Sequence, residues 1–542
     1  MAGSLRDMTP AQFSELLKFA TPAERPALLR ERFSFAEHLD EFCWFLWEER
    51  FSLPFNDLHW SLFRKQSAPG WRERKSAGLN IRTAIAAPRS YAKSTIATFA
   101  RLVHDIVYDR EAYIVVGSAT EKQSLGLARD LKLQFTAKGT PLDRLYGPFK
   151  VTGGVEQFEV SVRGRPSVAF MSCSSGGEVR GTKSTRGLRP TKFVLDDGEK
   201  KDRVRNPEQR HIWWQWLTKD VLKLGDRAGG FIVEVVGTIL HGESGLARLL
   251  KDAGWESERW QAIIKWPVHA ELWERCRHIW ADLSLGDHRR AAALAFFHAN
   301  RAAMEYGSQI LDPGSRSLFD LYEMIWSEGL AAFLQEMQND PSDPNSQIFF
   351  SEKFTRFRVE AGEIVCASGR RVRLSDLRIF GRWDPSTGSV HGDFAAIAIL
   401  GRDRYGYTYV LDVWMRRAKV SDQLSAAWTL AERWGATTIS LESNGFQGLL
   451  ADSYPKELED RRASGKFWRM NLVPEPSTDD KDMRIATLEP DVSNGWLQFN
   501  ESLDRDVLGQ FDSFPTGDHD DGPDAVHAAW RMLGGRPTEM SR

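Results

Sequence analysis

The chain has 542 residues, 42% of them hydrophobic, a length that exceeds a single core and predicts two globular domains. Its formal charge of -2 gives no overall signal for binding a polyanion or a membrane, so any such contact has to be local. Its four cysteines lie far apart without metal-ligand spacing, which disfavours a disulfide framework and a zinc site. The lack of a long apolar run and of a secretory pattern predicts a soluble protein of the reducing cytosol.

The first half of the chain reads as helices followed by an α/β domain. Residues 1–60 carry apolar side chains at helical spacing and predict an N-terminal helical segment. Over 61–270, apolar strands alternate with helical stretches, which predicts a mostly parallel sheet with helices on both faces. The expected strands are 81–87, 113–116, 168–171, 193–195, 231–236 and 262–266. Residues 271–360 are expected to form a helical linker or lid, with the connection between domains in the Pro-rich stretch 339–344.

The second domain is expected over 361–535, followed by a short tail at 536–542. Three strands joined by short turns predict an antiparallel meander, and a helix then leads to a fourth strand. These elements are the strands 379–383, 395–400 and 408–414, the helix 421–434, the strand 437–442 and a last helix 524–533, with turns at Gly388, Gly392, Tyr405 and Gly406. This order of strands and helices is typical of a ribonuclease-H-like fold.

A strand-to-helix turn at 87–95 predicts a phosphate loop, because backbone N–H groups, a lysine and a hydroxyl can together surround a phosphate. The residues expected to contact the nucleotide are Ala87, Pro88, Arg89, Ser90, Tyr91, Ala92, Lys93, Ser94 and Thr95. Ala87 and Ala92 stand where such loops usually carry glycine. Arg89 is placed to offset charge that develops on the γ-phosphate, the alternative being a solvated loop arginine.

An acidic pair ends an apolar strand about a hundred residues later, at Asp196 and Asp197. Asp196 ends the strand directly and is expected to hold Mg²⁺ together with Ser94, while either Asp197 or Glu199 orients the attacking water. Thr238 follows another strand and is expected to sense the γ-phosphate, the alternative being an ordinary turn. The basic segment 180–192 is expected to contact DNA phosphates or a neighbouring subunit's nucleotide, or else to be a solvated loop.

The second half carries acids at the ends of its predicted elements. Asp384 ends the first strand, Glu442 ends the fourth, and Asp521 or Asp524 opens the last helix. Three converging carboxylates can hold two divalent ions about 4 Å apart for phosphodiester cleavage. Hard oxygen ligands favour Mg²⁺ or Mn²⁺ over zinc. Asp393, Asp412 and His519 are weaker candidates, interpreted as turn, mid-strand and loop residues.

These motifs, taken together and in this order, resemble the large terminase subunit of tailed bacteriophages over about 55–535. The segments that carry the resemblance are 87–95, 186–190, 193–199, 236–241, 333–341, 383–386, 441–447 and 519–525. The resemblance implies an ATPase domain with a P-loop NTPase fold of the ASCE type and a ribonuclease-H-like nuclease domain. It implies ATP and Mg²⁺ as cofactors, with Mn²⁺ as a second choice at the nuclease.

The resemblance also implies the partners and the reaction. It implies a motor that drives double-stranded DNA into a procapsid and cuts it, with the small terminase subunit and the portal protein as partners. Such motors form a pentameric ring when docked or remain monomeric in isolation, act in the host cytoplasm and bind no membrane. The alternatives from the residues alone are a helicase-nuclease or recombination enzyme acting without a capsid, and a non-enzymatic DNA-binding protein whose acids are merely solvated.

Overall fold

The computed structural model describes residues 4–226, 230–341, 347–386, 393–442, 447–465, 468–475 and 481–535. The chain divides into two compact units, each built from several stretches of sequence. Unit 1 comprises Met1–Trp266, Gly307–Tyr322 and Leu330–Pro344, and unit 2 comprises Pro267–Tyr306, Glu323–Gly329 and Asn345–Arg542. The segment 271–360 is therefore shared between the two units. Within the described ranges, no helix combines the length and apolar character that a membrane span requires.

Unit 1 is built on an eight-stranded sheet in the order β3-β4-β5-β2-β6-β7-β1-β8. Its strands are β1 (Ile81–Ala86), β2 (Tyr113–Ser118), β3 (Phe149–Gly153), β4 (Gln157–Val162), β5 (Val168–Ser174), β6 (Lys192–Asp196), β7 (Ile232–Gly237) and β8 (Glu256–Arg259). All neighbours from β5 to β8 pair in parallel, whereas β4 is antiparallel to both β3 and β5. The strand β7 lies between β1 and β6, as in the ASCE class, which confirms the expected α/β fold.

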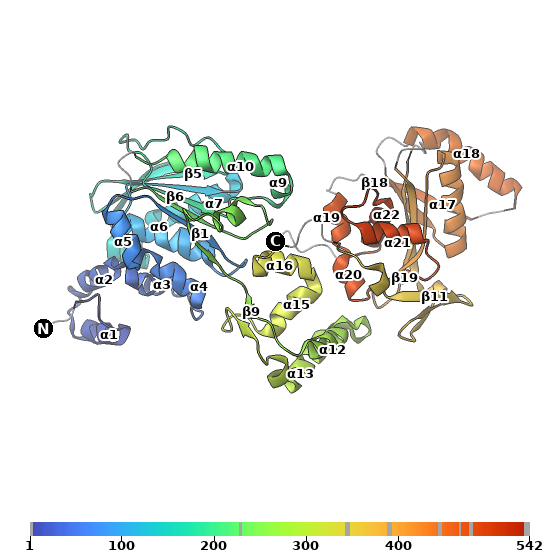
Figure 1. The fold of residues 1–542 in the computed structure, drawn as a ribbon, viewed down its shortest axis with the longest axis horizontal. Helices are drawn as coiled ribbons and strands as arrows, with labels where there is room; N and C mark the ends of the chain where they lie inside the picture. Colours follow the sequence, from blue (N-terminus) through green and yellow to red (C-terminus); the bar gives the residue numbers. More distant parts are fainter. Residues whose placement is uncertain are drawn as a thin grey trace. The chain divides into compact units, whose positions relative to one another are not determined.

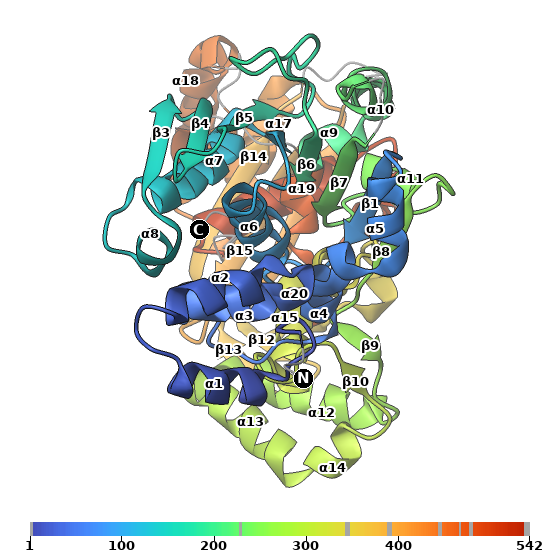
Figure 2. The ribbon, with the colours of Figure 1, turned by 90° about the vertical axis from the view of Figure 1, so that its left-hand side faces the viewer.

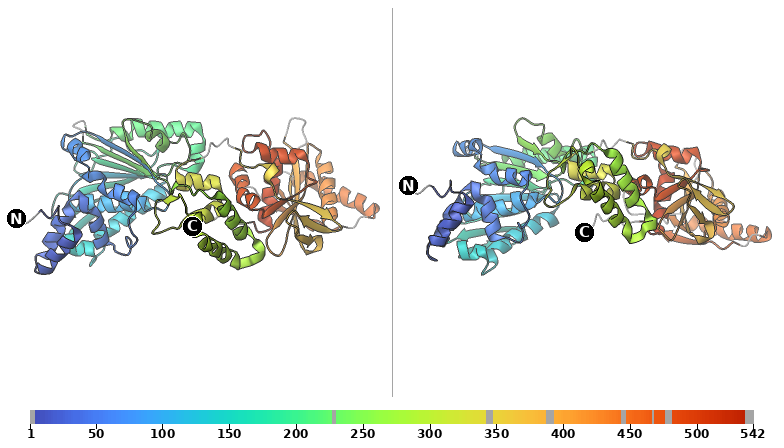
Figure 3. Two further views of the ribbon diagram at one scale, coloured as in Figure 1. Left: turned by 60° about the horizontal axis from the view of Figure 1, so that its bottom comes forward. Right: turned by 90° about the horizontal axis from the view of Figure 1, so that it is seen from below.

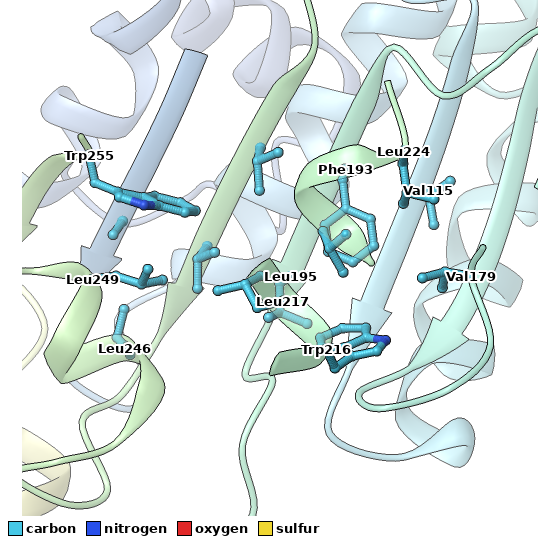
Figure 4. Close-up of a cluster of buried hydrophobic side chains, with 14 of the residues drawn as sticks. Val115, Val179, Phe193, Leu195, Trp216, Leu217, Leu224, Leu246, Leu249 and Trp255 are labelled. Carbon is cyan, nitrogen blue, oxygen red and sulfur yellow. The ribbon is translucent and has the colours of Figure 1, made fainter. Parts of the chain in front are cut away.

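Helices cover both faces of this sheet because side chains alternate along each strand. On β6, Phe193 and Leu195 pack in one cluster with Trp216 of α10 (Pro207–Lys219) (Figure 4). Lys192 of the same strand faces the other way and pairs with Asp105 of α6 (Arg101–Val107). The views in Figures 1 and 2 show α10 and α6 on opposite sides of the sheet.

The remaining helices of unit 1 lie at its N-terminus and around the sheet. They are α1 (Pro10–Phe19), α2 (Arg25–Ser34), α3 (Leu39–Leu46), α4 (Asp57–Arg64), α5 (Pro69–Ser76), η3 (Ser94–Ala100), α7 (Glu121–Thr136), α8 (Pro141–Tyr146), α9 (Lys201–Arg205), α11 (Gly245–Leu249) and α16 (Leu330–Gln338). The strand expected at 262–266 is wrong as a member of the main sheet. Its residues form β9 (Ile263–Lys265), which pairs with β10 (Gln309–Ile310) in a separate two-stranded sheet.

Unit 2 contains a nine-stranded sheet in the order β13-β12-β11-β19-β16-β15-β14-β17-β18. Its strands are β11 (Arg356–Glu360), β12 (Glu363–Cys366), β13 (Arg371–Arg373), β14 (Arg378–Asp384), β15 (Ala395–Arg402), β16 (Thr408–Arg416), β17 (Thr438–Glu442), β18 (Asn471–Glu475) and β19 (Leu497–Asn500). The meander β14-β15-β16 is antiparallel, while β17 pairs in parallel with β14, and β18 with β17. This topology confirms the ribonuclease-H-like fold expected from the sequence.

Two helices on opposite faces complete this layered domain. Trp428 of α17 (Val420–Trp434) packs in one cluster with Trp383 of β14. Ala529 of α22 (Asp521–Met532) packs in a different cluster with Ala396 of β15. Figures 1 and 3 show α22 in red and α17 in orange on the two sides of the sheet. Because α22 covers the face that Arg382 and Asp384 share, its first turn comes close to the end of β14.

The helices from 267 to 329 that belong to unit 2 pack around a tryptophan cluster. Trp496, just before β19, is fully buried, and its ring lies 5.3 Å from that of Trp280 in α12 (Ala270–Ala281). The Trp496 indole donates a hydrogen bond to the carbonyl of Ala281 at 2.6 Å. Asn494 donates to the carbonyl of Trp326 in α15 (Leu318–Glu328) at 2.6 Å. The other helices of unit 2 are α13 (Arg289–Ala299), α14 (Arg301–Met304), α18 (Gln447–Ala463), α19 (Lys481–Ala486), α20 (Glu489–Ser493) and α21 (Arg505–Ser513).

Candidate active sites

The turn after β1 has the backbone of a phosphate loop although it lacks the usual glycines. Ser90 has a φ of 63° and Ala92 a φ of 52°, the left-handed conformation that glycine adopts most easily. Successive changes of backbone hand turn N–H groups toward a common concave side, which favours anions. The loop is anchored at its start, where the Ala87 N–H donates to the carbonyl of Gly237 at 2.9 Å.

Lys93 links the loop to the ends of the two neighbouring strands. Its side chain is only 6% exposed, and its ammonium lies 3.4 Å from Asp197 Oδ2. It also donates a hydrogen bond to Thr238 Oγ1 at 3.3 Å. Thr238 in turn donates to the carbonyl of Ala87 at 3.3 Å. The structure thus brings Lys93, Asp197 and Thr238 together at one edge of the sheet, where ligands of parallel α/β sheets bind.

Asp196 lies at the end of β6, directly beneath the first turn of η3. Its two oxygens accept hydrogen bonds from Ser94 Oγ at 2.8 Å and Thr98 Oγ1 at 2.7 Å. Burial, followed by the charge of Asp197, raises the pKa of Asp196 to about 6. A hydroxyl and a carboxylate in contact are the pair that holds a magnesium ion in phosphate-loop proteins, so the donor set fits the expected cation.

The two acids that the sequence left as alternatives differ in their surroundings. Asp197 has a φ of 44°, is exposed and faces Lys93. Glu199 accepts hydrogen bonds from the N–H groups of Gly245 at 2.8 Å and Leu246 at 3.1 Å. Burial raises the pKa of Glu199, and these two N–H groups oppose that effect. Both oxygens of Glu199 therefore cap the N-terminus of α11 by accepting its N–H groups, whereas Asp197 faces Lys93 of the phosphate loop.

Arg89 sits on the outer side of the loop. Its guanidinium is 61% exposed and lies 3.8 Å from Glu336 Oε2, and its N–H donates to the carbonyl of Glu336 at 2.9 Å. Glu336 belongs to α16 and also pairs with Lys201 at 2.5 Å. In the basic segment, Arg180 pairs with Asp220, and the last residue, Lys192, is a buried member of β6. Lys192 therefore belongs to a strand and not to the basic loop that the sequence predicted.

In unit 2, the strand register aligns the nuclease acids. The pairs Trp383↔Leu441 and Glu442↔Glu475 place Asp384, Glu442 and Glu475 at the same edge of β14, β17 and β18. Neighbouring strands are about 4.8 Å apart, so these carboxyl groups are close neighbours. Asp521 and Asp524 join them from the first turn of α22.

The carboxylates around Asp384 are largely buried and repel one another. Burial raises the pKa of Asp384 to about 7, and the charges of Glu442 and Asp524 add to the effect. Burial also raises the pKa of Asp524 and of Asp521. Asp524 acts more strongly on Asp384 than Asp521 does, which indicates that Asp524 is the helix acid facing the strand acids. A divalent cation among these oxygens would offset their repulsion.

Basic side chains hold several of these carboxylates apart. Arg382 donates to Glu442 at 3.3 Å, Arg484 to Asp524 at 3.2 Å, and Lys481 lies 3.5 Å from Asp521. Over the described ranges, no three carboxylate, histidine or cysteine side chains converge on one point as metal ligands. Asp524 Oδ1 is buried and has no hydrogen-bond partner among the described residues. That oxygen and Asp384 fit a cation, provided that the carboxylates turn toward each other on binding.

The structure adds residues to this site that the sequence did not predict. Glu475, Arg382 and Lys481 are all within reach of the predicted acids. The signal for Arg382 was its position two residues before Asp384 on the same strand, which puts both side chains on one face. Asp393 is exposed, and Asp412 accepts from Trp434 at 2.9 Å. The expected turn at Gly388 and Gly392 and the motif residues 443–446 lie outside the described residues.

His519 lies beside Asp521 at the edge of the site. Its Nδ1 is 3.9 Å from Asp521 Oδ2, and Arg417 donates to its Nε2 at 3.0 Å. Phe394 stacks edge-on against His519, with ring centroids 5.0 Å apart, and its N–H donates to Asp521 at 3.3 Å. His519 therefore packs against the site and is not the free loop residue that the sequence suggested.

Comparison with known proteins gives one family match. Residues 381–532 match the family model described as the terminase RNaseH-like domain. No curated protein matches the chain.

Three solved structures illustrate the structural similarity. The large terminase of a thermophilic bacteriophage in complex with ADP aligns with a TM-score of 0.44 and 9% identity, covering 89% of this chain and 100% of its own. The HK97 bacteriophage large terminase aligns with a TM-score of 0.30 and 14% identity, covering 89% and 95%. The nuclease domain of the Thermus phage P74-26 large terminase aligns with a TM-score of 0.25 and 17% identity, covering 36% and 98%. Similarity at this level carries no functional inference.

The family match and the fold of unit 2 agree. The matched range begins in β14 and ends with α22, so it contains Asp384, Glu442, Asp521 and Asp524. The resemblance expected from the sequence is therefore confirmed for this part of the chain. Residues 381–532 therefore match the ribonuclease-H-like domain of terminases both in family model and in fold.

Proposed function

We propose that this protein is the large subunit of a viral terminase, a motor that uses ATP to translocate double-stranded DNA into a procapsid and that cuts the DNA. The observation that carries the proposal is the joining, in one chain, of a terminase ribonuclease-H-like domain to an ASCE-type sheet with a phosphate-loop turn. An ATPase joined to a nuclease in this way can couple movement along DNA to its cleavage.

In the ATPase, Lys93 and the backbone N–H groups of residues 90–95 bind the β- and γ-phosphates. Ser94 and Asp196 would hold Mg²⁺, which would supply charge neutralisation on the phosphates. Asp197 orients the attacking water because it faces Lys93, whereas Glu199 stabilises α11. Arg89 exchanges its contact with Glu336 for the γ-phosphate, and Thr238 responds to loss of that phosphate through its bond to Lys93.

In the nuclease, Asp384, Glu442 and Asp524 would hold Mg²⁺ or Mn²⁺, with Asp521 beside them. The ions would supply an activated water and stabilise the leaving oxygen of the phosphodiester. Asp524 is our choice over Asp521 because of its stronger interaction with Asp384 and its unpaired oxygen. Lys481 and Arg484 keep the helix acids apart until a cation binds.

The proposal extends to partners. We expect the small terminase subunit to deliver concatemeric DNA and the portal protein of the procapsid to dock the motor, in the host cytoplasm. A homo-oligomeric ring, pentameric when docked, fits a motor that surrounds DNA, and the protein is expected to be monomeric or weakly associated before docking.

The test separates the two active sites. Lys93→Ala should abolish ATP hydrolysis and leave Mn²⁺-dependent nicking of plasmid DNA, whereas Asp384→Ala should abolish nicking and leave ATP hydrolysis. Loss of both activities from either substitution would refute separate sites. Adding procapsids to the wild-type protein distinguishes a packaging motor, which protects DNA from added nuclease, from a helicase-nuclease that needs no capsid.

A further inference from the structure

A buried arginine lies beneath the proposed nuclease acids. Arg382 is 4% exposed and lies two residues before Asp384 on β14, so both side chains are on the face covered by α22. Its Nη2 donates to Glu442 Oε2 at 3.3 Å, and its Nη1 lies 3.6 Å from Glu475 Oε2. One guanidinium therefore lies between the acids that end β17 and β18.

A second arginine continues this chain of charges. Arg531 of α22 pairs with Glu475 Oε1, the oxygen that Arg382 does not face. The sequence of contacts Arg531, Glu475, Arg382, Glu442 therefore runs from the last turn of α22 across β18 and β14 to the end of β17. It holds the Glu442 carboxylate through its Oε2 oxygen.

The geometry explains why this position needs an arginine. Glu442 and Glu475 are register partners on parallel strands, about 4.8 Å apart, so their like charges repel unless a cation lies between them. The planar guanidinium presents donors in two directions and can contact both carboxylates at once, whereas an ammonium is a point charge on a flexible stem.

This inference rests on the proposed nuclease function: we infer that Arg382 is a positioning residue that holds the Glu442 carboxylate, through Oε2, in the orientation that binds a divalent cation. Glu475 is then the support of the arginine and contributes no oxygen to the cation. Partners of metal ligands in other proteins change metal affinity by about 10- to 100-fold when they are removed.

The experiment measures Mn²⁺ binding to the full-length protein by titration calorimetry, without DNA, alongside DNA nicking. Arg382→Gln should weaken Mn²⁺ binding by roughly 10- to 100-fold. Arg382→Lys keeps the positive charge but loses the planar guanidinium that contacts both carboxylates, and it should weaken Mn²⁺ binding by less than Arg382→Gln. Glu475→Gln should weaken binding in the wild-type background, and should partly restore it in the Arg382→Gln background by removing a repelling charge.

A matched control comes from another buried arginine in unit 2. Arg461 pairs with Glu457 at 2.8 Å and Glu432 at 3.4 Å on the α17 side of the sheet. Arg461→Lys should lower the melting temperature and leave Mn²⁺ affinity unchanged. If Arg382→Gln fails to fold by circular dichroism, Arg382→Lys decides in its place.

Two outcomes would overturn the inference. Unchanged or tighter Mn²⁺ binding in Arg382→Gln and Arg382→Lys would show that the arginine positions nothing. An equal loss from Glu475→Gln in both backgrounds would make Glu475 a direct ligand. A wild-type protein that neither binds Mn²⁺ nor nicks DNA would contradict both the proposed nuclease function and this inference. If the wild-type protein does both and the variants bind Mn²⁺ equally well, only the inference is wrong.

Discussion

Asp197 and Glu199 are two residues apart in the chain, yet they face different neighbours. Asp197 lies 3.4 Å from Lys93, while Glu199 accepts two N–H groups at the start of α11. Both oxygens of Glu199 therefore already accept a backbone N–H, which favours Asp197 as the acid that orients water in the proposed ATPase. The structure therefore distinguishes the surroundings of the two acids, which the sequence alone could not do.

Substitution of these two acids should separate their roles. Asp197→Asn should reduce ATP hydrolysis by at least about 100-fold, because it removes the base that orients water, and should leave nucleotide binding intact. Glu199→Gln should retain hydrolysis within a few-fold and lower stability by about 0.5–2 kcal/mol through the weakened cap. Steady-state ATPase assays and thermal melts check both, and the reverse pattern would exchange the roles.

Ala92 adopts a positive φ without being glycine. The left-handed conformation of Ala92 costs the folded state about 1–2 kcal/mol, which glycine would not pay. Glycine offsets part of this gain because it loses more conformational entropy on folding. Ala92→Gly should therefore raise the free energy of unfolding by about 0–1 kcal/mol and retain ATP binding. Ala92→Val serves as the opposite control and should destabilise the loop. Chemical denaturation measures both, and a clear loss from Ala92→Gly would contradict the strain.

The pKa of Asp384, raised to about 7 in the fold, makes stability depend on pH. Between pH about 4 and 7 the folded protein binds more protons at this site than the unfolded chain, so metal-free stability falls as pH rises through that window. Asp384→Asn cannot ionise. At pH 8 in chelator, its melting temperature should exceed that of the wild type by several degrees, and the difference should shrink toward pH 4. Equal melting at both pH values would be evidence against the repulsion.

At the scale of the elements, side chains at the end of α16 bond backbone groups that a neighbouring strand would otherwise bond. Gln338 donates to the Ile263 carbonyl and accepts from the Ile263 N–H, both at 2.9 Å. Asn339 accepts from the Ile239 N–H and donates to the Trp260 carbonyl, again both at 2.9 Å. These amides connect α16 to the segments that follow β7 and β8.

The cost of losing one such amide can be measured locally. Gln338→Met leaves two buried backbone groups of Ile263 unsatisfied, and each is worth about 1–3 kcal/mol. The free energy of unfolding of unit 1 should fall by about 2–6 kcal/mol, and amide exchange at Ile263 should accelerate. Gln157→Met, at an exposed position, is the control and should change neither. Unchanged exchange at Ile263 would show that the amide is dispensable.

Element prediction succeeded where apolar strands and turns were regular. The meander β14-β15-β16 and the parallel partner β17 follow directly from such patterns, and they bring Asp384 and Glu442 together. The strand expected at 262–266 exists as β9 but lies outside the main sheet, where it pairs with β10 and where Gln338 at the end of α16 bonds the Ile263 backbone. Local sequence does not show these long-range contacts. Glu475 was missed because it follows Pro474 within β18, and a proline in the sequence argues against a strand. Ser90 and Ala92 adopt glycine-like backbone angles, which explains how the predicted phosphate loop forms without its usual glycines.

At the scale of the whole molecule, the residues of the two proposed sites belong to different units. Any ligand that binds only the folded state stabilises it by about 2.7 kcal/mol at 100 times its dissociation constant. In calorimetry, ADP with Mg²⁺ should raise one melting transition and Mn²⁺ the other. Lys93→Ala should remove only the first shift and Asp384→Ala only the second. A single transition that responds to both ligands in every variant would mean that the units unfold together.

The tryptophan cluster at Trp496 bears on how this protein can be dissected. Its covering helices, including α12, come from residues earlier in the chain than the last stretch of unit 2. A nuclease fragment started at residue 345 would therefore lose the carbonyl of Ala281 and the ring of Trp280 that enclose this indole. Such a fragment would present a bare aromatic surface and be prone to self-association, whereas one that retains residues 267–329 would keep its cover.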